Sequence, residues 1–126
     1  MASTKDIGRA GEFFAAYVLE SHGVECHHVD RDGADLWCKV QGSMTTVQVK
    51  ACSRAVPSRP GSTDLRYRYH TLNGKGATWF CFVALDRGLL LLRHVSVIGK
   101  GKTLLRPELF TAVEQERTIE AFKKSC

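Results

Sequence analysis

The 126 residues contain no apolar run close to the roughly 20 residues that a membrane-spanning helix needs. The longest apolar runs, such as those at 79–85 and 89–92, have only the length of a strand. The opening residues, MASTKDIGRAGE, have no apolar stretch behind their charges, which argues against a cleaved secretory signal. The five cysteines form no CxxC pair, and their odd number fits reduced thiols better than a disulfide framework. We therefore expect an intracellular protein with a single domain over residues 1–126, long enough to form a core without crosslinks.

Acidic residues are scarce in the middle of the chain. Residues 54–106 contain ten Lys and Arg but two Asp and Glu, a net charge of +8, within a whole-chain charge of +5. The flanking segments 1–53 and 107–126 carry −2 and −1. A segment this basic predicts a surface that binds a polyanion, most often nucleic acid. The alternatives are a basic loop that meets only solvent, or an anionic membrane surface, which the lack of a basic amphipathic helix disfavours.

The spacing of apolar residues predicts an α+β fold on a mixed or antiparallel sheet. Ser3 or Thr4 is a typical helix cap, and the helix that follows is expected to end at Gly23. A second helix is predicted from the capping box at 111–114 to about residue 124. Between the helices, a turn is expected at 30–33 and a hairpin connection at 42–44. The predicted strands cover 24–29, 34–41, 45–52, 66–70, 79–85 and 89–97.

Four polar residues in the first 50 form a candidate catalytic set: Glu12, Asp35, Gln48 and Lys50. Because side chains alternate along strands, the last three share the polar face of the predicted hairpin, and we expect that face to approach Glu12. Each residue alone has an ordinary interpretation as a surface or turn residue. Together, carboxylate and amide oxygens beside an ammonium group suit a hard divalent cation and a phosphodiester.

Three segments carry a resemblance to a known family: Gly11-Glu12, Gly33-Ala34-Asp35-Leu36 and Val47-Gln48-Val49-Lys50-Ala51. They resemble the motifs of the PD-(D/E)XK nuclease superfamily, in particular archaeal-type Holliday junction resolvases and small homing endonucleases of that fold. The resemblance covers residues 8–53 well and the 79–97 hairpin loosely. It implies a restriction-endonuclease-like core, in which an α-β-β-β unit is followed by a further hairpin and a C-terminal helix.

The resemblance also implies a function and a ligand set. It implies a Mg²⁺-dependent DNA endonuclease, with Mn²⁺ as a substitute, that acts as a homodimer or higher oligomer because two strands are cut. The implied metal ligands are Glu12, Asp35, Gln48 and the backbone carbonyl of Val49, with Lys50 as the catalytic lysine. Gln48 stands where most members have an acidic residue, which removes one charge and is expected to weaken Mg²⁺ binding. The alternatives are an inactive DNA-binding module on the same fold and an RNA-directed nuclease.

Further candidates lie in and around the basic segment. The predicted nucleic-acid contacts are Ser53, Arg54, Arg59, Arg66, Arg68 and Lys75. Tyr67 and Tyr69 alternate with two of these arginines, so they either stack on bases or belong to an ordinary amphipathic strand. Cys26-His27-His28 lacks a second pair at zinc spacing, which favours structural histidines.

Overall fold

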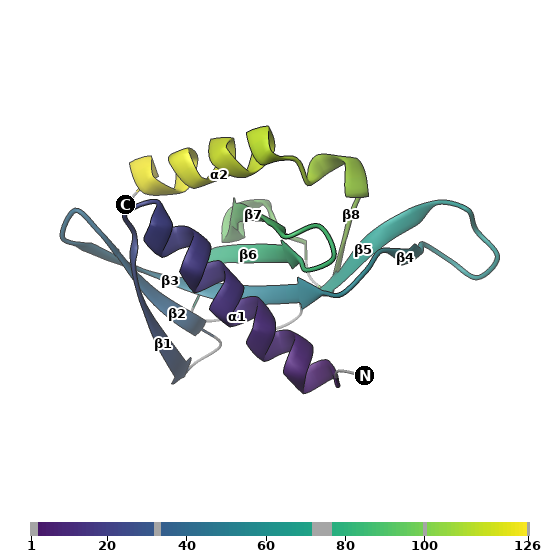
Figure 1. Ribbon diagram of the computed structural model, residues 1–126, viewed down its shortest axis with the longest axis horizontal. Helices are drawn as coiled ribbons and strands as arrows, with labels where there is room; N and C mark the ends of the chain where they lie inside the picture. The colour runs from purple at the N-terminus through teal and green to yellow at the C-terminus, as the bar shows by residue number, and fades with distance from the viewer. Residues whose placement is uncertain (1–2, 32–33, 72–76, 100, 126) are drawn as a thin grey trace.

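The computed structural model describes residues 3–31, 34–71, 77–99 and 101–125 (Figure 1). It confirms the predicted α+β class, with an N-terminal helix, a mixed sheet and a C-terminal helix. In chain order the elements are α1 (Thr4–Ser21), β1 (Glu25–Arg31), β2 (Ala34–Val40), β3 (Ser43–Cys52), β4 (Val56–Pro57), β5 (Leu65–His70), β6 (Trp79–Ala84), β7 (Leu89–His94), η1 (Val95–Val97), β8 (Lys102–Leu105), η2 (Pro107–Leu109) and α2 (Ala112–Ser125). In the described part of the chain, no helix is both long and apolar enough to span a membrane.

Five strands form the central sheet in the order β1-β2-β3-β6-β7. Neighbouring strands are antiparallel except β3 and β6, which run parallel. All six residues of β6 are buried. This burial on both faces explains why its sequence, WFCFVA, is continuously apolar instead of alternating.

Both helices cover one face of this sheet. Ala15 and Leu19 of α1 pack with Val47 of β3, and Phe122 of α2 meets the ring of Trp79 edge-on at 5.2 Å. The opposite face is covered, over β6 and β7, by a second sheet of order β4-β5-β8. The paired strands β4 and β5 project as an arm beyond the body of the molecule (Figure 1).

The two tyrosines of β5 belong to the core between the sheets. Tyr67 and Tyr69 are 1% and 2% exposed, and their hydroxyl groups donate to Asp86 and to the Val83 carbonyl at 2.8 and 2.9 Å. The hypothesis that they stack on bases is therefore wrong, and the amphipathic-strand alternative is confirmed. Alternation along β5 directs the tyrosines inward and leaves the neighbouring arginines half-buried on the other side.

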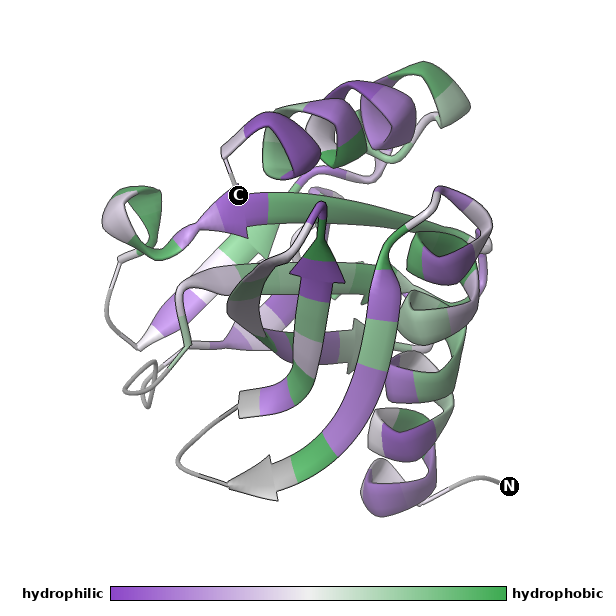
Figure 2. Ribbon diagram, turned by 90° about the vertical axis from the view of Figure 1, so that its left-hand side faces the viewer, coloured by the Kyte–Doolittle hydropathy of each residue, from purple (hydrophilic) through white to green (hydrophobic). Residues whose placement is uncertain are grey.

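The β2–β3 hairpin has the predicted side-chain parity but a shorter turn. Leu36 pairs with Val47, as expected, and the connection is the dipeptide Gln41-Gly42 instead of 42–44. Both turn residues have positive φ, 50° and 88°, as a two-residue hairpin turn requires. Figure 2 shows the alternation of apolar and polar residues as bands along the strands nearest the viewer.

Helix α1 begins at a capping box and packs closely against β3. The Ser3 hydroxyl accepts from the Asp6 amide and the Asp6 carboxylate accepts from the Ser3 amide, each at 3.2 Å. The helix stops before Gly23, whose φ is +84°, as predicted. Gly11 is buried, and a Cβ at this position would lie 2.4 Å from the Cβ of Ala51. Glycine therefore allows the close contact that brings the next residue of α1, Glu12, to the end of β3.

Candidate functional site

The candidate site lies where β2 and β3 part. Their pairing ends at Leu36 and Val47. Two residues further along β3, the backbone N–H of Val49 donates to Asp35 Oδ2 at 2.8 Å. A side-chain carboxylate thus takes the place that a strand carbonyl would fill in a continuing ladder, and Asp35 is held at this fork in the sheet.

The backbone of Val49 presents its carbonyl on the same side as Asp35. The Thr46 carbonyl accepts a hydrogen bond from the Thr78 amide at 3.1 Å, and the Cys52 carbonyl accepts one from the Leu85 amide at 2.9 Å. Thr78 and Leu85 directly flank β6. Even-numbered residues of β3 therefore direct their backbone groups toward β6. Because backbone groups alternate along a strand, the N–H and C=O of Val49 both point to the opposite edge, next to Asp35. The Val49 carbonyl therefore faces the edge of β3 that is left open beyond Val47, and its role as a ligand stays a prediction.

Glu12 and Asp35 line one pocket of about 460 Å³, here called the carboxylate pocket. Its walls are formed by Lys5, Gly8, Arg9, Glu12, Phe13, His28, Val29 and Asp35. The Glu12 side chain is 30% exposed, and its Oε1 lies 3.9 Å from Nδ1 of His28. We expected the polar face of the β2–β3 hairpin to approach Glu12. This prediction was wrong, because α1 packs on the apolar face of the hairpin. Glu12 and Asp35 instead line one pocket at the edge of β3 that is left open beyond the fork.

Gln48 is the first residue of β3 beyond its pairing with β2. Its Oε1 is buried and accepts no hydrogen bond from the described part of the chain. Leaving a buried amide oxygen unsatisfied costs about 1–3 kcal/mol, so this atom is expected to have a water or an ion as its partner. The residue does not line the carboxylate pocket itself, although it directly precedes Val49 in β3.

These donors fit a hard cation with few protein ligands. Within the described ranges, no three His, Cys, Asp or Glu side chains gather in a way that could hold a metal ion. A cation at the fork would therefore be bound by Glu12 and Asp35 together with neutral oxygens, from Gln48 and from the Val49 backbone. Mg²⁺ accepts such a set, because it prefers oxygen ligands and keeps several waters.

Lys50 lines a second pocket of about 450 Å³ on the other side of Gly8, which both pockets share. This basic pocket is lined by Thr4, Ile7, Gly8, Val49, Lys50, Ala51, Cys52, Ser53, Arg54, Val56, Arg68, Tyr69 and His70. None of these described lining residues is acidic. Burial raises the pKa of the Cys52 thiol to about 11, and its Sγ donates to the Arg68 carbonyl at 2.8 Å. The thiol is therefore neutral at physiological pH and adds no negative charge to the pocket.

The structure separates the predicted nucleic-acid contacts into groups. Ser53, Arg54 and Arg68 line the basic pocket. Arg66 instead pairs with Asp64 at 3.0 Å, and its hydrogen bond holds the pKa of that carboxyl below its ordinary value. Arg59 is exposed, between the two strands of the arm. Lys75 lies outside the described residues.

Three residues of the carboxylate pocket did not stand out in the sequence as functional. Lys5 and Arg9 precede Glu12 by seven and three residues, a spacing that places all three on one side of a helix, and this signal could have revealed them. His28 comes from β1, and its ring lies 4.9 Å from that of Phe13, a contact between distant segments that no local pattern predicts. Its neighbour His27 makes a surface contact with Glu25 at 2.6 Å, which fits the structural interpretation of that residue.

No family model and no curated protein sequence matches this chain. Among solved structures, it resembles that of a bacterial homing endonuclease, I-Ssp6803I, with a TM-score of 0.69 over the whole length of both chains. The two sequences are 19% identical over this alignment, so the likeness is one of fold. The chain therefore has the fold of this homing endonuclease, with a fork in its sheet that brings two carboxylates into one pocket.

Proposed function

We propose that the protein is a Mg²⁺-dependent nuclease of the PD-(D/E)XK type that hydrolyses phosphodiester bonds in DNA. The observation that carries this proposal is the composition of the fork. Asp35 is held there by the Val49 amide, and Glu12 lines the same pocket. Gln48, next to Val49 in β3, has a buried oxygen that accepts no hydrogen bond from the residues described. These three side chains and the Val49 carbonyl would hold the cation.

A cation bound there would neutralise charge on the phosphate and lower the pKa of a water in contact with it. The protein's own groups supply orientation and charge. The Val49 amide restrains the Asp35 carboxylate, so little reorganisation is needed when a cation binds. Lys50, two residues beyond Gln48, provides an ammonium group that stabilises the extra negative charge of the transition state.

The fold supports a nuclease, since the similar solved structure is described as that of a homing endonuclease. The charge distribution supports a nucleic-acid substrate. Arg54, Arg68 and His70 line the basic pocket, which shares Gly8 with the carboxylate pocket. A phosphate backbone that runs across both pockets would place one phosphodiester at the fork.

Purified protein incubated with labelled four-way junction, linear duplex, single-stranded DNA and RNA, each with Mg²⁺ and with EDTA, tests this proposal. We expect DNA cleavage with Mg²⁺ or Mn²⁺ and none in EDTA. Preference for the junction indicates a resolvase, and cleavage of one duplex sequence indicates a homing endonuclease. Binding without cleavage at any Mg²⁺ or Mn²⁺ concentration would show an inactive module, and cleavage confined to RNA would contradict a DNA substrate.

A homodimer or higher oligomer belongs to the same proposal, because both resolution and double-strand cleavage need two cuts. Light scattering after size exclusion, with and without duplex, measures the mass directly. We expect at least twice the monomer mass of 14.0 kDa for the DNA-bound protein. One protein chain per duplex during double-strand cleavage would contradict it.

A further inference from the structure

We infer that the basic pocket is a subsite for a second backbone phosphate, on the same strand as the phosphate that is cut. This inference rests on the proposed function and extends it, since it assigns the ligand of a pocket that lies outside the carboxylate pair. The ligand is identified by its chemistry, a phosphodiester anion within a nucleic-acid strand.

The charge of the pocket selects an anion. Lys50, Arg54 and Arg68 bring three basic side chains to the lining, His70 adds ring nitrogens, and no described lining residue is acidic. The carboxylate pocket, by contrast, sets Lys5 and Arg9 against Glu12 and Asp35. Of the two pockets, the carboxylate pocket therefore offers carboxylate oxygens to a cation, whereas the basic pocket offers N–H groups to an anion.

The basic pocket is also built to hold its donors in place. Nη2 of Arg68 donates to the carbonyls of Pro57 and Ser58 at 3.4 and 3.3 Å, which fixes the guanidinium against the arm. A guanidinium has five N–H donors, so these two contacts do not exhaust it. Thr4 and Ser53 add hydroxyl groups to the lining. The rim is open to a polymer, because Arg54 and His70 are exposed.

The position of the pocket identifies the phosphate as a neighbour of the cut one. The two pockets share Gly8, and Val49 and Lys50 of the basic pocket directly follow Gln48 along β3. Consecutive phosphates of one strand are separated by a single sugar, so a strand that fills the fork passes next over this pocket. The volume of about 450 Å³ lies within the range of about 300–1,000 Å³ that is common for ligand sites.

The first test measures binding without cleavage. A fluorescent 24-base-pair duplex is titrated with wild-type protein and with Arg54→Gln in EDTA at several salt concentrations. We expect the slope of log affinity against log salt to fall by about one unit in the variant, because one phosphate contact is lost. The matched control is Arg117→Gln, which removes the same charge from an exposed residue of α2 and should leave the slope unchanged.

The second test locates the contact. Single methylphosphonates, which carry no charge, are placed along the cleaved strand, and binding is measured in EDTA. For the wild type we expect one sensitive position next to the cut, where the substitution weakens binding about tenfold. Arg54→Gln should be insensitive at that position and unaltered in its sensitivity elsewhere.

The outcomes separate this inference from the proposed function. If Arg54→Gln keeps the wild-type slope and the wild-type methylphosphonate pattern while Mg²⁺-dependent cleavage continues, the subsite is wrong and the nuclease stands. If the slope falls as expected but no metal supports cleavage, the phosphate site stands and the nuclease is wrong. Equal weakening by Arg117→Gln would also overturn the subsite, because general charge would then explain binding.

Discussion

The two pockets that share Gly8 are almost equal in size, but one combines carboxylates with basic residues and the other has basic residues alone as its charged lining. The carboxylate pocket contains Glu12 and Asp35, and the basic pocket contains Lys50 and two arginines. Strand β3 links the two, since its Val49 amide donates to Asp35 of the carboxylate pocket and the next residue, Lys50, lines the basic pocket. The comparison teaches that a fork in a sheet can place a pair of carboxylates and a cluster of basic side chains in two pockets that share a residue.

The largest loss of cleavage is expected from a substitution in the carboxylate pocket. Asp35→Asn keeps an oxygen for the Val49 amide but removes the charge that a cation needs. We expect cleavage to fall by at least about 10²-fold, because a lost cation removes several kcal/mol of transition-state stabilisation. DNA binding in EDTA should stay equal or become tighter, since a repulsion from phosphate is lost.

The control for Asp35→Asn is Glu120→Gln, which removes the same charge from an exposed position on α2. It should leave cleavage unchanged. Wild-type cleavage by Asp35→Asn, measured on the same substrate, would show that the fork is not the catalytic centre.

The next largest loss of cleavage is expected from Lys50, which lines the basic pocket. Lys50→Met keeps an apolar stem of similar length and removes the ammonium group. We expect cleavage to fall by about 10²- to 10³-fold, as for the loss of one group that stabilises transition-state charge. The loss should persist at every salt concentration. Recovery at low salt would instead make Lys50 a general binding residue like Arg54.

How the two pockets arise could be predicted only in part from the sequence. The helix cap, predicted at Ser3 or Thr4, and the parity of the β2–β3 hairpin are local patterns, and the structure confirms the cap at Ser3 and the parity. The point at which β2 and β3 part is not local, because it depends on how far each strand follows its other neighbour. Hence Asp35 and Lys50 could be assigned to one polar face, but not to two separate pockets.

Other parts of the fold were missed for the same reason. Strands β4 and β8 have two and four residues, show no clear alternation, and are defined by pairing with β5. The side on which α1 packs was also unpredictable locally. It is decided by the contact between Gly11 and Ala51, residues forty positions apart.

The packing of α1 on β3 predicts opposite effects on stability for alanine substitutions at two glycines of the helix, Gly11 and Gly8. Gly11→Ala should lower the free energy of unfolding by about 1–3 kcal/mol, because the new methyl group would overlap Ala51 in a packed interface. Gly8→Ala should raise it by about 0.5–1 kcal/mol, since nothing lies within 4 Å of a Cβ there and alanine favours the helix. Urea unfolding measures both. Equal effects of the two substitutions would contradict the close packing of α1 on β3.

A smaller effect, on the Mg²⁺ concentration that cleavage requires, is expected when a carboxylate is added next to the fork. Gln48→Glu adds a negative charge beside Asp35 and Glu12, so half-maximal cleavage should need about tenfold less Mg²⁺. The measurement is cleavage rate against Mg²⁺ concentration at constant ionic strength. An unchanged or higher Mg²⁺ requirement would argue that residue 48 does not contact the cation.

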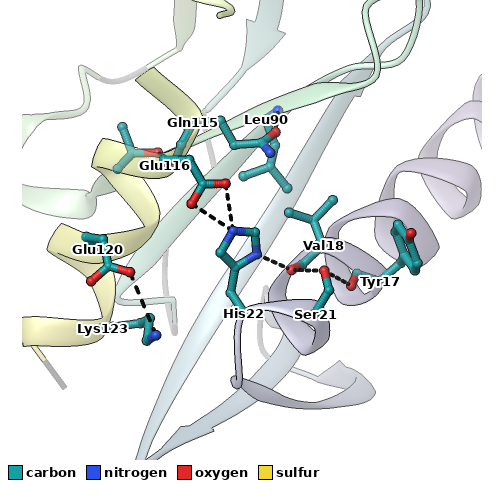
Figure 3. A network of polar contacts seen from close by, with 10 residues as sticks. Tyr17, Val18, Ser21, His22, Leu90, Gln115, Glu116, Glu120 and Lys123 are labelled. Carbon is teal, nitrogen blue, oxygen red and sulfur yellow. Dashed lines mark hydrogen bonds and ion pairs between the residues drawn. The ribbon is translucent and has the colours of Figure 1, made fainter. Parts of the chain in front are cut away.

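The smallest effect should lie far from both pockets, where α1 meets α2 (Figure 3). Nδ1 of His22 bonds to the Val18 carbonyl at 2.8 Å, and Nε2 bonds to the Glu116 carboxylate at 2.8 Å. These two acceptors raise the pKa of His22 above its ordinary value. A group with a raised pKa stabilises the fold below its ordinary pKa and loses that contribution as the pH rises through the raised one.

The free energy of unfolding should therefore fall as the pH rises from about 6 to about 8, by less than about 1 kcal/mol, since the Glu116 side chain is 55% exposed. Glu116→Gln should flatten this dependence and leave the salt slope of DNA binding unchanged. A stability that rises over this pH range, or a Glu116→Gln variant with the full wild-type dependence, would contradict the assignment.

The division between the two pockets is tested most directly by measuring DNA affinity in EDTA and cleavage in Mg²⁺ for four proteins: wild type, Asp35→Asn, Arg54→Gln and the double variant. The account predicts that Asp35→Asn loses cleavage and keeps affinity. Arg54→Gln should lose affinity and recover cleavage at low salt, and the double variant should show both losses independently. If both single variants instead lose affinity and cleavage in parallel, the pockets act as one general binding surface and the account is contradicted.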